Sequence, residues 1–216
     1  KAAADVGSAG GRAATEVRVA GGKVAIVGAG PAGIACAAFL ARAGADVTVF
    51  DKEEGPGGTV RHVIPSFRIR DTAIAQDVEI ARSYGARFEL GREIKDLSDL
   101  KDQGYGTIVL AIGAHKGMPI GVDTEKELNA VDFLAKARKD PEALDLGEHV
   151  VVIGAGNTAM DAARMAKRID GVEDVTVAYR RTKRFMPADA QELEEAIEDG
   201  VLLKELLAPN VQRAGR

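Results

Sequence analysis

The chain has 216 residues, 46% of them hydrophobic, and a formal net charge of −4. This length fits one or two globular domains, and the slightly acidic balance predicts neither nucleic-acid binding nor attraction to an anionic membrane. The one cysteine, Cys36, can form neither an internal disulfide nor a CxxC redox pair, so we expect a small buried helix residue and a reducing, cytoplasmic setting. The sequence has no apolar run of about 18 residues and no signal-peptide pattern, which predicts no membrane insertion.

Residues 1–22 are rich in Ala and Gly and contain almost no bulky apolar side chains. Such a segment cannot bury enough surface to offset the entropy of ordering it, so we expect a flexible linker. The stretch "KVAIVGAG" then predicts a buried strand and a glycine turn, residues 31–44 a helix, and "ADVTVFD" a parallel strand. This is a right-handed βαβ unit.

The middle of the chain continues the alternation of helices and strands. After a loop with Gly57 and Gly58, residues 71–84 predict an amphipathic helix with Ile74, Val78 and Ala81 on one face. The segments "ARFELG" and "GTIVLAIGA" predict strands, and residues 131–138 predict a helix. We therefore assign residues 23–120 to a first domain and 121–147 to a connection.

The pattern restarts at "HVVVIGAG", followed by a predicted helix over 159–169 and the strand "EDVTVAYRR". An acidic helix over 189–199, with Leu193, Ala196 and Ile197 facing inward, and the strand "VLLKELLAP" complete a second domain, residues 148–216. The predicted fold class is α/β, with two Rossmann-like βαβ dinucleotide-binding units that are internal repeats of one module.

The first glycine turn, Gly28 to Gly33, has the G-x-G-x-x-G spacing. The first glycine allows the tight turn, the second lets a diphosphate approach the backbone, and the third permits close packing of helix on strand. Asp51 ends the following strand 18 residues after Gly33, where a carboxylate can accept hydrogen bonds from ribose hydroxyls. The first unit is therefore predicted to bind a dinucleotide.

The second turn keeps Gly154 and Gly156 but has Ala159 in place of the third glycine, so helix and strand should lie slightly farther apart. Where the first unit has Asp51, the second has Tyr179 followed by Arg180 and Arg181. Guanidinium groups bind the 2′-phosphate of NADP, which a carboxylate would repel, so NADPH is predicted. Two further cations, Lys183 and Arg184, fit either phosphate binding or a solvated loop.

Together these motifs resemble the flavoprotein module of the glutamate synthase small subunit, which is similar to parts of dihydropyrimidine dehydrogenase and of a selenate reductase-like FAD subunit. The resemblance rests on "VAIVGAGPAG", "GGTVRHVIPSFRI", "IVLAIGA", "VVVIGAGNTAMDAARMA", "YRRTKRFMPA" and "EEAIEDGV", and extends from Lys23 to about Leu207. "VIPSFRI" and "GVEDVTVAYRR" are most similar to the selenate reductase-like branch. The resemblance implies an FAD-binding first unit and an NADPH-binding second unit.

The resemblance also implies the positions that contact each cofactor. Around FAD it places Gly28, Gly30, Pro31, Ala32 and Gly33 at the diphosphate, Asp51 at the ribose, Gly58, Thr59, Arg61, Ile64 and Pro65 along the flavin, and Ala111, Ile112 and Gly113 between the domains. Around NADPH it places Gly154, Gly156, Asn157, Thr158 and Ala159 at the diphosphate, and Arg180 and Arg181 at the 2′-phosphate.

The implied function is an FAD-dependent NAD(P)H oxidoreductase module that passes hydride from NADPH to FAD and electrons on to an iron–sulfur domain or subunit. The family also has an N-terminal iron–sulfur domain and a C-terminal return to the FAD domain, so we expect a truncated fragment. One alternative, a thioredoxin-reductase-like disulfide reductase, needs a cysteine pair that this sequence lacks. The other alternative is a nucleotide-binding or interaction fragment without turnover.

No acid–base residue and no metal site is predicted, because the sequence has neither HExxH nor GxSxG and its three histidines are scattered. Some charged residues also have a simpler interpretation as solvated side chains. For Arg61, His62 and Arg68 this interpretation stays open. For the acidic helix it is the expected one, and it covers Glu194, Glu195, Glu198 and Asp199.

Overall fold

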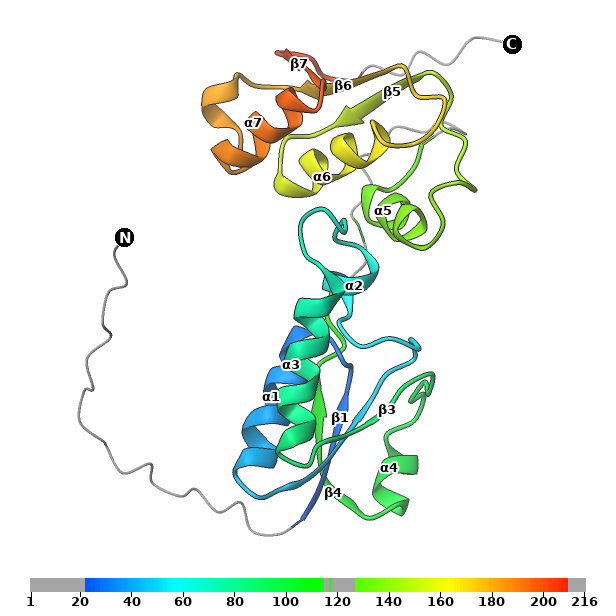
Figure 1. Ribbon diagram of the computed structural model, residues 1–216, viewed down its shortest axis with the longest axis vertical. Helices are drawn as coiled ribbons and strands as arrows, with labels where there is room; N and C mark the ends of the chain where they lie inside the picture. Colours follow the sequence, from blue (N-terminus) through cyan, green and yellow to red (C-terminus); the bar gives the residue numbers. More distant parts are fainter. Residues whose placement is uncertain (1–21, 115–116, 118–126, 210–216) are drawn as a thin grey trace, which may run out of the picture.

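The structure is a computed structural model that describes residues 22–114, 117 and 127–209. Its described residues form two units that lie end to end along the longest axis of the molecule (Figure 1). The predicted linker at residues 1–22 lies outside these residues except for Gly22. Among the described residues, no helix is long and apolar enough to cross a membrane.

The first unit is a parallel four-stranded sheet with the strand order β3-β2-β1-β4. Each strand except β1 follows at least one helix, which is the connection that parallel strands require. The elements are β1 (Lys23–Val27), α1 (Pro31–Arg42), β2 (Asp46–Phe50), α2 (Thr59–His62), α3 (Asp71–Ser83), β3 (Arg87–Glu89), α4 (Ser98–Asp102) and β4 (Tyr105–Leu110).

Apolar side chains cover both faces of the first sheet. Val24 and Ile26 of β1 face one way and pack with the buried side of α1 and with Ala81 of α3, whereas Ala25 faces the other way and packs with Phe50 and Leu100 of α4. Alternating residues of a strand point to opposite faces, so a continuous apolar run indicates burial on both sides. The predicted inward face of α3 is confirmed, because all three of its predicted apolar residues are buried.

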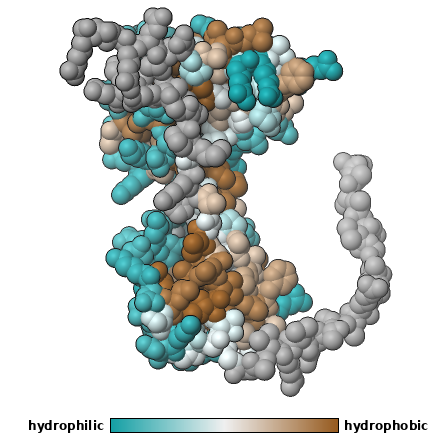
Figure 2. Space-filling model, turned by 180° about the vertical axis from the view of Figure 1, so that it is seen from behind, coloured by the Kyte–Doolittle hydropathy of each residue, from teal (hydrophilic) through white to brown (hydrophobic). Residues whose placement is uncertain are grey.

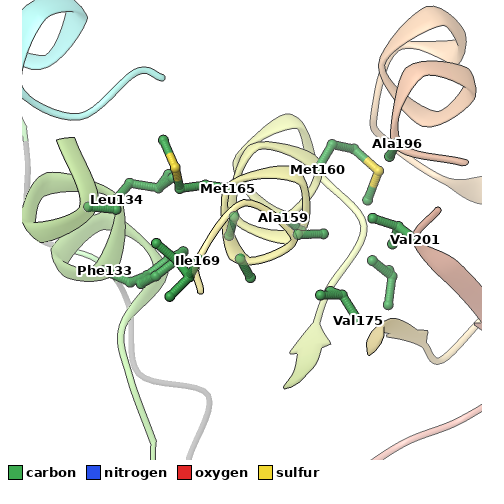
Figure 3. Close-up of a cluster of buried hydrophobic side chains, with 14 of the residues drawn as sticks. Phe133, Leu134, Ala159, Met160, Met165, Ile169, Val175, Ala196 and Val201 are labelled. Atoms are coloured by element: carbon green, nitrogen blue, oxygen red, sulfur yellow. The ribbon is translucent and has the colours of Figure 1, made fainter. Parts of the chain in front are cut away.

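The second unit is a smaller parallel sheet with the strand order β5-β6-β7. Its helices gather on one face, and α6 lies between α5 and α7 (Figures 1 and 3). The elements are α5 (Ala130–Lys139), β5 (His149–Ile153), α6 (Asn157–Ala166), β6 (Asp174–Tyr179), a 3₁₀ turn η1 (Lys183–Phe185), α7 (Ala190–Glu198) and β7 (Leu202–Glu205).

The core of the second unit is built around α6. Met165 extends toward Leu134 of α5, and Met160 extends toward Ala196 of α7 (Figure 3). Helix α5 falls inside the stretch predicted as a connection, and its apolar side packs into this second core. On the opposite face of the sheet Val151 is 61% exposed.

The two βαβ units and the α/β class agree with the sequence prediction, but three local features do not. Ile197 was expected to face inward and is 46% exposed, because it lies in the last turn of α7, beyond the buried Leu193 and Ala196. The short helices α2 and α4 were not predicted, because one turn of helix leaves too little periodicity to detect.

Candidate dinucleotide-binding sites

The first glycine turn joins β1 to α1 and is closed tightly by the protein's own backbone. The Gly28 N–H donates to the Phe50 carbonyl oxygen across 2.7 Å, and Gly28 has a φ of 109°. A Cβ at Gly28 would lie 2.3 Å from the Ala111 carbonyl oxygen, and one at Gly33 would lie 1.8 Å from the Gly28 carbonyl oxygen. Both positions therefore need glycine.

Asp51 follows β2, and its carboxylate holds the first turn in place through hydrogen bonds to the backbone. Its Oδ2 accepts a hydrogen bond from the Ala29 N–H at 2.6 Å, and its Oδ1 accepts one from the Glu53 N–H at 2.9 Å. Each carboxylate oxygen can accept a second hydrogen bond. The geometry thus gives Asp51 a structural role in the turn and leaves acceptor capacity for a ribose hydroxyl.

A second glycine pair lies directly against the first turn. The Gly57 N–H donates to the Ala29 carbonyl oxygen at 2.7 Å, and a Cβ at Gly58 would lie 2.8 Å from the Gly30 Cα. Gly58 also has a φ of 53°, in the left-handed region that favours glycine. The predicted positions Gly58 and Thr59 are therefore next to the first turn, where α2 begins.

The remaining predicted positions of the first unit lie on two sides of this turn. The Ala111 N–H donates to the Val27 carbonyl oxygen at 2.8 Å and so ends the β1–β4 pairing just before Gly28, while Ile112 is 63% exposed. Arg61 belongs to α2, and Pro65 is fully buried in the segment after it. The positions not yet placed are Pro31 and Ala32, in the first turn of α1, Ile64, whose N–H donates to the Thr59 carbonyl oxygen, and Gly113, after Ile112.

The second turn joins β5 to α6 and repeats the backbone geometry of the first. Gly154 has a φ of 128°, and its N–H donates to the Ala178 carbonyl oxygen at 3.1 Å. Ala159 is buried with its Cβ 3.8 Å from where a Cβ at Gly154 would lie, so this turn accommodates the methyl group that the first turn excludes. Asn157 and Thr158 begin α6 and are exposed.

A segment before α7 lies against the second turn as Gly57 lies against the first. The Ala188 N–H donates to the Ala155 carbonyl oxygen at 3.0 Å, and the Asn157 Oδ1 accepts a hydrogen bond from the Asp189 N–H at 3.0 Å. Part of the Asn157 side chain is thereby used to hold this segment. Its amide nitrogen remains a donor.

The residue that corresponds in space to Asp51 is Tyr179. The Gly28 N–H bonds to Phe50 and the Gly154 N–H bonds to Ala178, so the next residue along is Asp51 in one unit and Tyr179 in the other. Tyr179 is 8% exposed, and its hydroxyl donates to the Phe185 carbonyl oxygen at 2.6 Å. From the sequence alone, Asp51 corresponds to the whole run Tyr-Arg-Arg at residues 179–181. Only the strand register shows that Tyr179 is its counterpart.

The basic residues after Tyr179 are exposed at the end of β6. They are Arg180, Arg181, Lys183 and Arg184. Among the described residues, no carboxylate forms an ion pair with any of their side chains. The segment is fastened through backbone groups instead, because the Glu205 carboxylate accepts from the Lys183 N–H at 2.7 Å. These cations are therefore available to an anion.

Both turns have room for a diphosphate at a helix N-terminus. A Cβ added at Gly156 would have no other atom of the described residues within 4 Å, and for one added at Gly30 the nearest atom, the Gly58 Cα, is 3.8 Å away. The first amides of a helix lack acceptors within the helix and attract anions. A dinucleotide fits both turns, whereas no cluster of three potential metal ligands occurs among the described residues.

The charges on α6 and α7 form ion pairs, which corrects part of the sequence interpretation. Asp199 was expected to be solvated, but its carboxylate accepts hydrogen bonds from Arg168 at 2.7 Å and from Arg164 at 2.6 Å, and these bonds lower its pKa. Glu195 also pairs with Arg164. Hydrogen bonds from Gln191 and Arg164 lower the pKa of Glu195. Burial raises the pKa of Asp161, on the neighbouring side of α6.

With two glycine turns at the carboxyl ends of two parallel sheets, the architecture is that of an oxidoreductase with two dinucleotide-binding units. The family model described as pyridine nucleotide-disulphide oxidoreductase matches residues 22–204. The chain belongs to this family, which is a family of enzymes.

Curated relatives are identical to this chain at about two fifths of the aligned positions. "Putative oxidoreductase YgfK" of Escherichia coli (strain K12) is 45% identical over 86% of this chain and 18% of that protein. The NADPH-Fe(3+) oxidoreductase subunit beta of Geobacter sulfurreducens is 40% identical over 83% of this chain and 28% of that protein. The glutamate synthase [NADPH] small chain of Escherichia coli is 36% identical over 87% of this chain and 43% of that protein. The chain thus spans less than half the length of each.

Solved structures share the fold at lower identity. Mycobacterium tuberculosis FprA in complex with NADPH aligns with a TM-score of 0.69 and 24% identity, over 82% of this chain and 47% of that one. Thioredoxin reductase of T. acidophilum aligns with a TM-score of 0.59 and 22% identity, over 86% of this chain and 64% of that one. These likenesses confirm the predicted two-unit α/β fold.

Proposed function

We propose that the first unit binds FAD, that the second binds NADPH, and that the chain carries hydride from NADPH to FAD within a larger oxidoreductase. One observation carries this proposal: two turns with the same backbone geometry are followed by opposite charges. The position after the second strand is Asp51 in the first unit, whereas in the second it is the neutral Tyr179, followed by the exposed Arg180 and Arg181.

In the first unit, residues 23–120, the turn from Gly28 to Gly33 would hold the FAD diphosphate at the start of α1. Asp51, already fixed by the Ala29 N–H, would accept from a ribose hydroxyl. Gly58 and Ala111 border the turn on two sides and would exclude water from the bound cofactor.

In the second unit, where residues 148–216 are the part proposed to bind NADPH, the start of α6 would hold the NADPH diphosphate through backbone N–H groups and Asn157. Arg180 and Arg181 would form charge-assisted hydrogen bonds to the 2′-phosphate. The buried Tyr179 keeps this position uncharged, so the residue that corresponds to Asp51 does not repel the phosphate.

FAD bound in the first unit would supply two-electron hydride chemistry and one-electron transfer to iron–sulfur centres. We propose such a centre as the partner, on another domain or subunit, because two relatives are named as a beta subunit and a small chain. The one cysteine of the sequence cannot supply disulfide chemistry, and it fits a reducing cytoplasm. For the chain itself we name no acid–base residue.

The assignment of the second unit is tested by replacing both arginines, Arg180→Ala and Arg181→Ala, and measuring NADP⁺ and NAD⁺ affinity by calorimetry. Losing charge-assisted hydrogen bonds worth about 1.5–3 kcal/mol should weaken NADP⁺ binding roughly 10- to 100-fold and leave NAD⁺ nearly unchanged. Arg42→Ala, an exposed arginine at the end of α1, is the matched control. Equal losses for both nucleotides would contradict the proposed 2′-phosphate site.

The flavin assignment is tested by titrating the purified chain with FAD, following the visible spectrum, and then adding NADPH without oxygen. Retention of FAD and bleaching by NADPH support the oxidoreductase module. A chain that retains FAD but is not bleached would be a nucleotide-binding fragment without turnover, which is the alternative function.

A further inference from the structure

Residues 61–71, here called the docking segment, connect the two units. They follow Gly58 and Thr59 at the first turn, and α2, where they begin, lies at the junction of the units in Figure 1. Within the described residues, every side-chain hydrogen bond between the units involves this segment. Two of them come from Arg138 of α5, which donates to the Arg61 carbonyl oxygen at 2.8 Å and pairs with Asp71.

The central contact of the docking segment is Arg68. Its guanidinium pairs with Asp161 of α6 and with Glu192 of α7, two carboxylates that lie 93 and 124 residues away in the sequence. The three side chains are only 19%, 12% and 15% exposed. A planar guanidinium can bond two carboxylates at once, which the point charge of a lysine does less well.

The neighbouring Phe67 packs against a second set of charges, on α6 and just after its end. The guanidinium carbons of Arg164 and Arg168 lie 4.6 Å and 4.5 Å from the centre of the Phe67 ring. Both arginines are held by Asp199, through hydrogen bonds of 2.6 Å and 2.7 Å. The ring therefore meets cations that are already fixed in place, and cation–π attraction adds to the ion pairs of Arg68.

These contacts connect the two glycine turns by a short path. At one end Gly58 touches Gly30 in the first turn. At the other end Arg68 binds Asp161, one helical turn after Asn157, where α6 begins at the second turn. Only nine residues lie between Gly58 and Arg68, and the helix that Arg68 contacts is the one whose N-terminus forms the second site.

We propose that Arg68 is a positioning residue that fixes the angle between the two nucleotide-binding units. Without its guanidinium, Asp161 and Glu192 would face the same space as two partly buried like charges. Both carboxylates belong to the second unit, so what the two units lose is the set of ion pairs from Arg68 that joins them. Water entering between the units would then hydrate the two unpaired carboxylates, which favours separation of the units. This inference goes beyond the proposed function, because it depends on the two units and not on which nucleotide each one binds.

The test measures the distance between the units in the whole chain without added nucleotide. In a Cys36→Ser background, spin labels are placed at Glu79→Cys on α3 and Glu194→Cys on α7, two exposed positions, and read by pulsed electron paramagnetic resonance. The parent should give one narrow distance. In Arg68→Ala the population at that distance should fall at least two-fold, while Arg70→Ala, an exposed arginine of the same segment, should match the parent.

A distance distribution in folded Arg68→Ala equal to that of the parent would overturn the proposal. Circular dichroism shows whether this variant folds. If it does not, Arg68→Lys is measured instead, because it keeps the charge but spans the two carboxylates less well. Lysine should then give a broader distribution than the parent, and a parent-like distribution would again refute the role of Arg68. Since no nucleotide is present, failure of the FAD or NADPH assignments leaves this result unaffected.

Discussion

The two units use one backbone geometry but enclose it differently. In the first, Gly58 and Ala111 approach the glycine turn from two sides. In the second, Gly156 has open space around it and Asn157 and Thr158 are exposed. An enclosed turn suits a cofactor that stays bound, and an open one suits a nucleotide that must leave after each reaction. We therefore expect a longer residence time for the nucleotide proposed at the first turn than for the one proposed at the second.

The first sheet is also more completely covered than the second. Helices and apolar side chains cover both faces of the first sheet, whereas the second has its helices on one face and leaves Val151 exposed on the other. Exposed apolar residues also occur on the first unit, and Figure 2 shows a hydrophobic patch on the lower half of the molecule. Near the end of β4, Leu110 and Ile112 are 58% and 63% exposed.

The third position of each turn gives the largest expected difference between the units. Gly33→Ala would place a methyl group 1.8 Å from the Gly28 carbonyl oxygen, so the backbone must shift, at a cost of about 3 kcal/mol. Ala159→Gly removes a methyl group from a roomier turn and should cost about 1 kcal/mol, the usual difference in helix propensity. Urea unfolding followed by circular dichroism measures both free energies.

Gly44→Ala is a useful control for the first substitution. Gly44 has a positive φ of 89°, whereas Gly33 lies within α1 and does not, and a Cβ added at Gly44 would have no atom of the described residues within 4 Å. This variant therefore separates backbone strain from steric overlap. If Gly33→Ala and Ala159→Gly destabilised the protein equally, the two turns would not differ in tightness, and the comparison would fail.

The next effect concerns Asp51, whose carboxylate fastens only the first turn. Asp51→Ala leaves the Ala29 and Glu53 N–H groups without their acceptor and should cost about 2 kcal/mol of stability as well as FAD affinity. Asp51→Asn keeps one acceptor oxygen and should recover part of the stability. Thermal unfolding with and without FAD separates the two effects, and an Asp51→Ala variant as stable as the parent would refute the fastening role.

The sequence predicted most of this comparison because the signals are local. Glycines at fixed spacing, β-branched runs before them and the charge after the next strand all lie within about 30 residues of one another. The buried face of α3 followed from helical periodicity in the same way. The short helices and the exposure of Ile197 were not predicted from the sequence, because each depends on a single helical turn.

The contacts that the sequence could not predict join segments that lie far apart along the chain. Arg68 contacts Asp161 across 93 residues, and neither residue has a neighbour in the sequence that indicates the pairing. Asp199 and Glu195 were expected to be solvated for the same reason, since Arg164 lies on α6 and Arg168 just after it, about 30 residues away in the sequence. The equivalence of Tyr179 with Asp51 needed the register of two sheets.

A smaller effect is expected at Tyr179, the counterpart of Asp51. Tyr179→Phe removes the hydrogen bond to the Phe185 carbonyl oxygen and should cost about 1 kcal/mol, with a modest loss of NADP⁺ affinity because the segment after Arg181 is less ordered. Calorimetry with NADP⁺ and NAD⁺ checks the second part. Tyr84→Phe on the exposed end of α3 is the control. Unchanged stability and affinity would mean that the hydroxyl does not support the basic segment.

The smallest expected effect is a dependence of stability on pH that arises in the second unit. Hydrogen bonds from Arg168 and Arg164 lower the pKa of Asp199 below its ordinary value of 3.8. A carboxyl with a lowered pKa stabilises the fold above its unfolded pKa, and this stabilisation is lost as the pH falls through the folded pKa. Asp161 acts in the opposite direction, because burial raises its pKa and its contribution decreases as the pH rises past 3.8.

Asp199→Asn should therefore reduce the loss of unfolding free energy between about pH 5 and pH 3, and Asp161→Asn should increase it. Denaturant titrations at several pH values measure these slopes, with Asp170→Asn, an exposed aspartate after α6, as the control. Because these ion pairs are partly solvent-exposed, high salt should weaken the effect of Asp199. Parallel curves for the parent and Asp199→Asn would show that the paired charges on α6 and α7 arrange the helices without stabilising them.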